Sequence, residues 1–463
     1  MRTPKSLKFT IIGAGSVCFC PATLSDILLS EPITATSLTI SLMDIDEKSL
    51  KISEDYAREA IRLTGRDIHL EATTHLEKSL EGTDFVIAAI EVDRYYYWSM
   101  DFHIPRRYGF RQVYGENGGP GSMFHTLRNL PPILHIAKTM EKICPDAWLL
   151  NYTNPEAKLV EGVSRLTKIK VVGLCHGEGM GMDQLSEIMG IPKEDISADV
   201  AGLNHFGWFT RIQHKTTGED LYPLLREKES RMDWLARWDE LGLSRLMLRT
   251  YGLYPYPGTN HIGEYIAWSD EMLASTKIQY FFDPVQNDPW SQNGKVPEFI
   301  YSFAMNPTAR PLFPDETEAI TETPGLCEHF TLKDGLHKSG EYGIPIAEAI
   351  AFDIPRHIGA VNVPNNGFVP NLPDGMVVEI PADVDGDGIH PIRCPELPVA
   401  IASMIETQGA IHRLLIEAFQ EKSRNKLLQA MLLDPTISNY QNAVALINEM
   451  CQRQKEILPP MEW

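Results

Sequence analysis

The chain has 463 residues, of which 43% are hydrophobic, and it carries 42 basic against 62 acidic side chains for a net charge of −20. A chain of this size and apolar content is expected to fold, most readily as two domains. The acidic balance excludes nucleic acid and an anionic membrane as partners, because both need a basic surface. No apolar run reaches the roughly 20 residues of a membrane span, and residues 1–5 lead into a strand without a cleavable signal. We therefore expect a soluble, cytoplasmic enzyme.

The cysteines indicate the same compartment. They number seven and are scattered without a framework spacing: Cys18, Cys20, Cys144, Cys175, Cys327, Cys394 and Cys451. An odd, scattered set is typical of reduced thiols in the cytosol. Most are expected to be small core residues, and only Cys175 stands in the context of a ligand.

Five apolar runs alternate with helical patterns in the first 200 residues. The runs are 8–12, 38–43, 85–90, 148–150 and 169–174. Helices are expected between them, notably over 50–64 and 123–143. Such alternation predicts a parallel, doubly wound α/β sheet, and we assign residues 1–200 to a Rossmann-type, NAD-binding domain.

The second part of the chain, residues 201–463, is predicted as an α+β domain. A strand is expected over 207–212, followed by helices up to residue 248, an aromatic loop over 251–256 and helical segments over 398–431 and 438–457. The segment 383–388 resembles the start of a calcium loop, but Cys394 stands where the bidentate Glu belongs. A hairpin turn between 376–380 and 389–392 is the better interpretation.

The first strand runs into a glycine-rich turn, Gly13-Ala-Gly15-Ser16, where backbone amides can approach a pyrophosphate at a helix start. Cys18 replaces the third glycine of the fingerprint, so a tight turn without a ligand remains an alternative. The second strand ends at Asp44. A carboxylate there holds the ribose hydroxyls of NAD and repels the extra phosphate of NADP, unless it only caps the next helix. NAD is the favoured cofactor.

Polar residues follow the later strands, and the carboxyl ends of parallel strands converge on one crevice. They include Glu91, Asn154 and the pair Cys175-His176. Asn154 offers an amide to a sugar hydroxyl or a metal, or is a buried turn amide. Cys175 and His205 match the thiolate and imidazole ligands of a Mn²⁺-like ion, although either one alone is as readily a core residue. Two protein ligands leave positions open for a substrate.

The chain is similar along nearly its whole length to the NAD- and divalent-metal-dependent glycosidases of glycoside hydrolase family 4. The segments that carry the resemblance are 13–16, 101–109, 118–121, 151–155, 175–178, 202–208, 261–265 and 361–367. The resemblance implies the fold of lactate and malate dehydrogenases. It also implies that residues 201–463 bind metal and substrate, and that the protein is a homodimer or homotetramer.

The activity implied by the resemblance is a redox-assisted elimination. NAD⁺ takes hydride from C3 of the sugar, Mn²⁺ polarises the resulting ketone, and a base removes the acidified C2 proton. The aglycone leaves C1 with help from an acid, water adds, and the hydride returns, so that the net reaction is hydrolysis.

Residue roles follow from the same resemblance. The metal ligands and the substrate-binding amide are Cys175, His205 and Asn154. His176 stands at the position of the acid, which is Asp in members acting on 6-phosphorylated sugars and His in a group acting on unphosphorylated ones. The base is a tyrosine in phosphosugar members; here His261 stands at that position and is favoured, with Tyr265 as the substitute or as a core residue.

The expected substrate is an unphosphorylated α-glucoside or α-galactoside. Glu91 stands where phosphosugar members have an arginine, and a carboxylate repels a phosphate. Glu178 can hydrogen-bond hydroxyls of a neutral hexose. The alternative is an α-glucuronidase or α-galacturonidase, with Arg94, Arg106 or Arg107 receiving the carboxylate. Two further rivals need no Cys/His metal pair: an NAD-dependent dehydrogenase of the 2-hydroxy-acid type and a non-catalytic NAD sensor.

Overall fold

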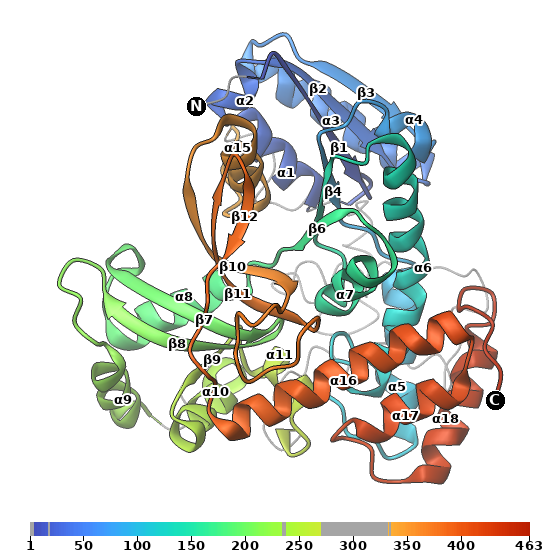
Figure 1. Ribbon diagram of the computed structural model, residues 1–463, viewed down its shortest axis with the longest axis vertical. Helices are drawn as coiled ribbons and strands as arrows, with labels where there is room; N and C mark the ends of the chain where they lie inside the picture. Colours follow the sequence, from blue (N-terminus) through green and yellow to red (C-terminus); the bar gives the residue numbers. More distant parts are fainter. Residues whose placement is uncertain (1–3, 17–18, 234–237, 270–331, 333–334) are drawn as a thin grey trace, which may run out of the picture.

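The computed structural model describes residues 4–16, 19–233, 238–269, 332 and 335–463. The described strands form one sheet of 12 strands in the order β3-β2-β1-β4-β5-β6-β10-β11-β7-β8-β9, with β12 paired to β11 (Figure 1). The strands are β1 (Ser6–Ile12), β2 (Ser37–Met43), β3 (His69–Thr73), β4 (Phe85–Ala88), β5 (Trp148–Asn151), β6 (Lys170–Gly173), β7 (Ile196–Leu203), β8 (Phe206–His214), β9 (Tyr254–Tyr256), β10 (Arg356–Pro364), β11 (Val377–Asp385) and β12 (Gly388–Pro391).

Helices surround this sheet. They are α1 (Phe19–Leu28), α2 (Glu31–Thr34), α3 (Glu47–Thr64), α4 (Leu76–Leu80), α5 (Arg94–Arg107), α6 (Gly119–Ile143), α7 (Glu156–Leu166), α8 (Gly177–Met189), α9 (Tyr222–Arg231), α10 (Trp238–Tyr251), α11 (Thr259–Ile262), α15 (Gly343–Phe352), α16 (Val399–Glu421), α17 (Arg424–Leu433) and α18 (Tyr440–Arg453). Among the described helices, none is long and apolar enough to cross a membrane.

The parallel half of the sheet confirms the doubly wound prediction. Its order, β3-β2-β1-β4-β5-β6, is typical of dinucleotide-binding folds. Alternate residues of β1 serve opposite faces: Phe9 and Ile11 join a core with Leu24 of α1, whereas Ile12 joins another with Ile133 of α6. Because helices bury both faces, the strands consist of nearly continuous apolar runs, which the sequence displays.

The second half of the sheet is antiparallel. β10 pairs with the last parallel strand, β6, and β11 then pairs with β7. The predicted hairpin is confirmed, since β11 and β12 are joined at Asp385 and Gly388 across a two-residue turn. The sheet is continuous across residue 200, which lies inside β7, and the division into 1–200 and 201–463 remains a prediction.

Three details differ from the sequence-based expectations. The edge strand β3 was not predicted, because its sequence, His-Leu-Glu-Ala-Thr, lacks an apolar run. The single helix expected over 398–431 is two helices: Lys422 adopts the left-handed conformation with φ +54°, and Ser423 accepts a hydrogen bond from Lys426 N to begin α17. The aromatic loop contains the short strand β9. Cys18 lies outside the described residues.

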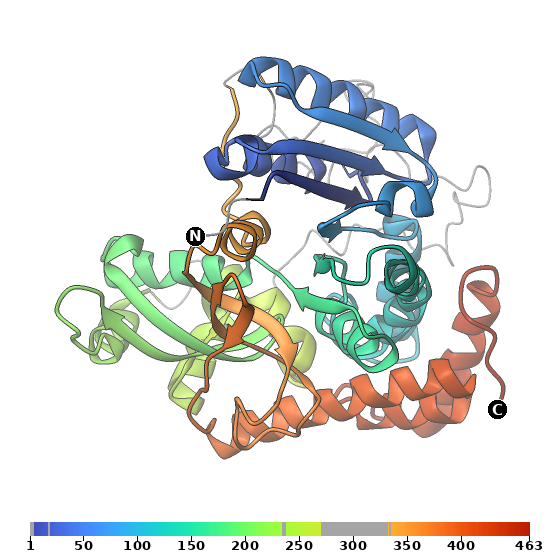
Figure 2. The ribbon, with the colours of Figure 1, turned by 45° about the horizontal axis from the view of Figure 1, so that its top comes forward.

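The C-terminal helices gather on one side of the molecule. α16, α17 and α18 lie beside α5 and α6 and away from the N-terminal strands (Figures 1 and 2). Side chains such as Leu428 and Met450 share a core there with Ile104 of α5 and Phe124 of α6. The C-terminal helices thus pack against α5 and α6. Of these, α5 begins three residues after Glu91, one of the predicted crevice residues.

Candidate active site

A row of paired residues crosses the sheet just before the predicted metal ligands. From β6 to β9 the row runs Gly173, Asn362, Glu379, Gly202, Gly207 and Tyr256. The glycines make room for larger neighbours, since a Cβ on Gly207 would overlap the ring of Tyr256. Cys175 lies two residues after Gly173, beyond the end of β6, and His205 lies three residues after Gly202, in the turn after β7. Both predicted ligands therefore lie within three residues of this row.

The structure brings Cys175 and His205 together. Cys175 Sγ lies 3.6 Å from His205 Nε2. At this separation a thiolate and an imidazole would be close enough for one divalent ion to contact both. Within the described ranges, no set of three or more His, Cys, Asp or Glu side chains has metal-binding geometry. The two donors fit a divalent ion whose other ligands come from elsewhere.

His205 occupies a strained position. It is the second residue of the two-residue turn between β7 and β8, and its φ is +64°, a region that residues with a Cβ rarely adopt. The side chain of its neighbour Asn204 is tied down by Glu379, which accepts an N–H at 3.0 Å. Backbone strain that the surroundings hold in place is typical of functional residues.

Of the two base candidates, His261 lies against the Cys-His pair. Its ring centroid is 4.7 Å from that of His205 at an interplanar angle of 83°. Burial lowers the pKa of His261, so the imidazole is neutral at pH 7. The hydroxyl of Tyr265 instead donates to the carbonyl oxygen of Asn204 at 3.2 Å, and its ring stacks on Phe206. The placement of Tyr265 fits the core alternative.

His176 pairs with a carboxylate that the sequence did not single out. Its Nδ1 lies 3.2 Å from Oε1 of Glu341, a residue 165 positions along the chain. This hydrogen bond raises the pKa of His176. The imidazole side chain is more than half exposed, whereas Glu341 is largely covered. His176 thus lies at the rim of the site beside a carboxylate that favours its protonated form.

Glu91 is held as an ionised carboxylate. His125 Nε2 and Asn129 Nδ2 each lie 2.9 Å from one of its oxygens, and Arg94 is 3.7 Å away. Burial alone would raise the pKa of Glu91, but His125 and Arg94 outweigh it and lower the pKa to about 2. Asn129 also donates to the carbonyl oxygen of Asn154 at 2.8 Å, which places Asn154 beside Glu91.

Glu178, which the sequence suggested as a partner of sugar hydroxyls, is buried and already hydrogen-bonded within the protein. It is buried in the first turn of α8 and accepts a hydrogen bond from the hydroxyl of Tyr342 at 2.7 Å. Burial raises its pKa. One of its carboxylate oxygens is thus already occupied by Tyr342, and the role of Glu178 toward sugar hydroxyls remains a prediction.

The glycine turn after β1 has the shape of a dinucleotide cradle. Gly13 has φ +84°, and a Cβ there would overlap the carbonyl oxygen of Ala89, so only glycine fits. Gly15 N donates to Asp44 at 2.7 Å. Ser16 Oγ accepts from the backbone N–H at the start of α1 at 3.1 Å. The strand order reverses between β1 and β4 at this point, which is where open α/β sheets bind ligands.

Asp44 does not cap the following helix. The N-cap of α3 is Asp46, whose carboxylate accepts from Lys48 N at 3.1 Å. Asp44 accepts instead from the backbone N–H groups of Gly15 and Asp46. Its carboxylate therefore stands beside the glycine turn, where a ribose would lie, and the capping alternative is wrong.

Family models for "Family 4 glycosyl hydrolase" and "Family 4 glycosyl hydrolase C-terminal domain" match residues 8–191 and 200–437. The chain belongs to the family 4 glycosyl hydrolases. It is 31% identical to an alpha-glucosidase of Erwinia rhapontici, with 97% of this chain and 98% of the relative covered. It is 30% identical to an alpha-galactosidase of Bacillus subtilis (strain 168), with 93% of each covered.

Solved structures agree with this membership. The family 4 chain is similar to a 6-phospho-alpha-glucosidase from gut microorganisms in complex with NAD and glucose-6-phosphate, at 25% identity and a TM-score of 0.78 over 99% of this chain and 100% of that one. A malate dehydrogenase of Cryptosporidium parvum shares the fold alone, at 15% identity and a TM-score of 0.50 over 91% and 100%. The predicted family and dehydrogenase-like fold are confirmed, and the alternative of an ordinary dehydrogenase is wrong.

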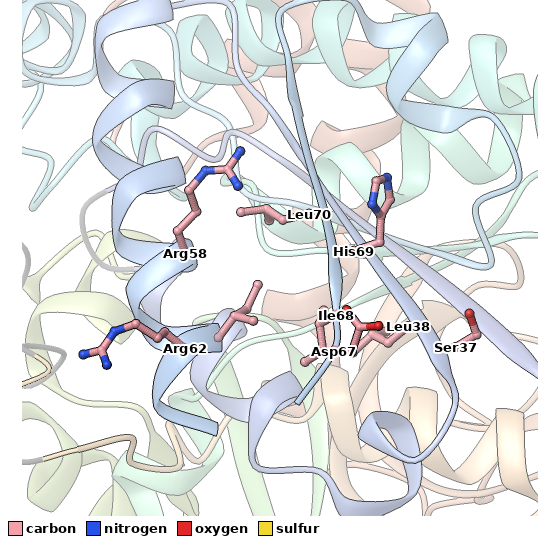
Figure 3. Close-up of a pocket in the computed structure, with 9 residues that line it drawn as sticks. Ser37, Leu38, Arg58, Arg62, Asp67, Ile68, His69 and Leu70 are labelled. Atoms are coloured by element: carbon pink, nitrogen blue, oxygen red, sulfur yellow. The ribbon is translucent and has the colours of Figure 1, made fainter. Parts of the chain in front are cut away.

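A surface hollow of about 740 Å³ lies elsewhere on the family 4 enzyme (Figure 3). Arg58 and Arg62 of α3 stand on one side of it and His69 on the other. Ser37 and His69 are the first residues of β2 and β3, so the hollow is at the amino ends of the strands. The crevice residues lie beyond the carboxyl ends, and the hollow is therefore separate from the candidate active site.

Proposed function

We propose that this family 4 enzyme is an NAD- and Mn²⁺-dependent α-glycosidase that acts on an unphosphorylated α-glucoside or α-galactoside. The observation that carries the proposal is the 3.6 Å contact between Cys175 and His205 at the sheet edge that also bears the glycine turn. The alpha-glucosidase and alpha-galactosidase relatives, and the NAD-bound 6-phospho-alpha-glucosidase, support the reaction class and the cofactor.

The charges around Glu91 support a substrate without phosphate. Glu91 is ionised, and Arg94 is shared between Glu91 and Glu116. Because Arg94 already pairs with two carboxylates, it is a poor receptor for a phosphate and equally for a uronate. Arg106, a second of the three candidates for a uronate, donates to Gln112 O at 2.8 Å and lies over a phenylalanine ring. A neutral hexose avoids these costs.

The residues divide the chemistry between them. When bound, NAD⁺ takes and returns the hydride of the sugar C3, and the divalent ion polarises the neighbouring oxygens. Cys175 and His205 hold the ion. His261, kept neutral by burial, takes the C2 proton, while His176, whose pKa Glu341 raises, holds the proton that leaves with the glycosidic oxygen. The lowered pKa of His261 suits a base, and the raised pKa of His176 suits an acid.

The remaining crevice residues bind the cofactor and the sugar. The turn formed by Gly13, Gly15 and Ser16 lies where a pyrophosphate would approach the start of α1, and Asp44, which accepts from Gly15 N, is the residue proposed to hold the ribose hydroxyls. Asn154 is half-buried, and its side chain makes no hydrogen bond with any described residue. It is the amide proposed to hold a sugar hydroxyl.

The experiment is hydrolysis of 4-nitrophenyl α-glucoside, α-galactoside, α-galacturonide and 6-phospho-α-glucoside in D₂O, with and without NAD⁺, Mn²⁺ and a reductant. We expect release of nitrophenol from a neutral hexoside only when both cofactors are present, with deuterium at C2 of the product. Release without C2 deuteration or without NAD⁺ dependence would refute the mechanism. Preference for the phosphorylated or uronic substrate would refute the substrate class.

Assembly and location complete the proposal. We propose a homodimer or homotetramer in the cytoplasm, with the first 200 residues forming the NAD-binding domain. Val399, Leu433 and Tyr440 of the C-terminal helices are exposed, which supports contacts between subunits there. The described cysteines are free thiols, as expected in a reducing compartment. Sedimentation equilibrium measures the assembly, and a monomer at micromolar concentration would contradict it.

A further inference from the structure

The ring of His205 has a different partner on each of its nitrogens. Its Nε2 faces Cys175 Sγ at 3.6 Å, and its Nδ1 lies 3.0 Å from the terminal amide nitrogen of Asn117. Asn117 is 3% exposed and His205 is 6% exposed, so water does not compete for this contact. Asn117, which is not one of the two predicted ligands, therefore contacts Nδ1 of His205, the ring nitrogen that faces away from Cys175.

The backbone of Asn117 is clamped on both sides. The carboxylate of Glu264 accepts from the N–H groups of Glu116 at 2.7 Å and of Asn117 at 3.0 Å. Lys158 donates to the carbonyl oxygen of Asn117. A Cβ on Gly118 would overlap the backbone of Glu264, so the loop is pressed against that residue. The Asn117 side chain is consequently held toward His205 and is not free to swing away.

The tautomer of His205 decides whether it can bind a metal. An imidazole ligates through a nitrogen that carries no proton, so ligation through Nε2 requires the proton on Nδ1. That N–H then needs an acceptor. The oxygen and nitrogen of an asparagine amide exchange places by a half-turn of the amide group, and either one can face the ring.

We propose that Asn117 is a positioning residue for the metal site. With its oxygen toward Nδ1–H, it holds His205 in the tautomer whose Nε2 lone pair faces Cys175. With its nitrogen toward Nδ1, it serves the opposite tautomer, in which Nε2–H points at the sulfur. The inference rests on the proposed role of Cys175 and His205 as ligands and adds the residue that prepares one of them.

The test measures Mn²⁺ affinity of the NAD-free full chain, from the loss of the electron paramagnetic resonance signal of free Mn²⁺. Asn117→Leu keeps the shape and removes the hydrogen bond, so its affinity is expected to fall about 10- to 100-fold. Asn117→Asp presents acceptors only, and its affinity is expected to stay near that of the unchanged protein. The control is Asn371→Leu, which loses hydrogen bonds to Leu397 away from the site and should leave Mn²⁺ affinity unchanged.

Two results would overturn the inference: Mn²⁺ affinity of Asn117→Leu equal to that of the unchanged protein, or a folded Asn117→Asp that loses as much as Asn117→Leu. If Asn117→Leu does not fold, two other variants make the test. Asn117→Asp must keep the Mn²⁺ affinity, and Asn117→Gln, which moves the amide away from its position, must lose Mn²⁺ affinity. Co²⁺ loading adds a signature, since a thiolate-to-cobalt absorption band should weaken in parallel with affinity. If the unchanged protein shows no such band, the assignment of Cys175 and His205 as ligands fails. If His205→Ala loses the band but Asn117→Leu keeps both the band and the affinity of the unchanged protein, only the role of Asn117 is refuted.

Discussion

Replacing Glu156 by methionine is expected to stabilise the protein, and the gain is expected to grow with pH. Glu156 begins α7 and is 1% exposed, and neither of its carboxylate oxygens has a hydrogen-bond partner among the described residues. One oxygen fills the space that a Cβ of Gly173 would take. Burial raises the pKa of Glu156 well above its ordinary value of 4.5, and the nearby Glu379 adds to the effect. The folded protein therefore keeps the proton on this carboxyl to a higher pH than the unfolded chain does.

The sign and size of the effect follow from proton linkage. In the unfolded chain Glu156 ionises above pH 4.5, whereas the folded protein keeps the proton, so stability falls as pH rises from 4.5 toward the folded pKa. Between these two pKa values the slope approaches about 1.4 kcal/mol per pH unit. With an unfolding entropy of about 2.1 cal/mol/K per residue over 463 residues, each pH unit in that window lowers the unfolding midpoint by roughly 1.4 °C. Glu156→Met does not titrate and escapes this loss.

Scanning calorimetry at pH 5, 6 and 7 on the parent, Glu156→Met and Glu156→Gln makes the measurement. Glutamine keeps the shape and the buried polar group but binds no proton, so its midpoint should follow the pH dependence of the methionine variant while lying below it. Parallel pH dependence of all three proteins would mean that the folded state does not retain the proton on Glu156, and the reasoning would be refuted.

Three further outcomes are expected. Cys175→Ser should lose nearly all Mn²⁺-dependent hydrolysis, and full activity of this variant would exclude the thiolate as a ligand. The parent protein should lose activity in air and regain it with reductant plus Mn²⁺. Glu341→Gln removes the group that raises the pKa of His176, so the alkaline fall of kcat/KM should move to lower pH, and an unchanged pH profile would separate Glu341 from the acid. Gly13→Ala, at φ +84° and with its Cβ against Ala89 O, should cost about 1–2 kcal/mol or more in backbone strain and abolish NAD⁺ binding measured by fluorescence titration.

Much of the parallel half of the fold was predictable because its strands are buried on both faces. Phe9, Ile11 and Ile12 are all apolar for that reason, and the same holds for β4. The edge strand β3 was missed because one of its sides meets solvent and its sequence carries no apolar run. The break between α16 and α17 was missed because a lysine in the left-handed conformation leaves no mark in a helical pattern.

The candidate site was predictable only in part. The pairing of Cys175 with His205 was expected from their positions after two strands, and the structure brings them together. Asn117 and Glu341 had no local signal, because their roles depend on contacts with residues 88 and 165 positions away. Neither spacing nor residue type reveals such partners.

The sequence by itself determined which reactive groups this protein carries: a glycine turn after the first strand, an acidic residue at the end of the second, and a cysteine and histidines after later strands. These are properties of residue types and of local order along the chain. Only the tertiary structure decided which imidazole has a lowered pKa and which a raised one, that Asp46 and not Asp44 caps α3, and that Tyr265 turns its hydroxyl to a backbone carbonyl. Burial and hydrogen-bond partners set those outcomes, and both arise only when distant segments pack against one another.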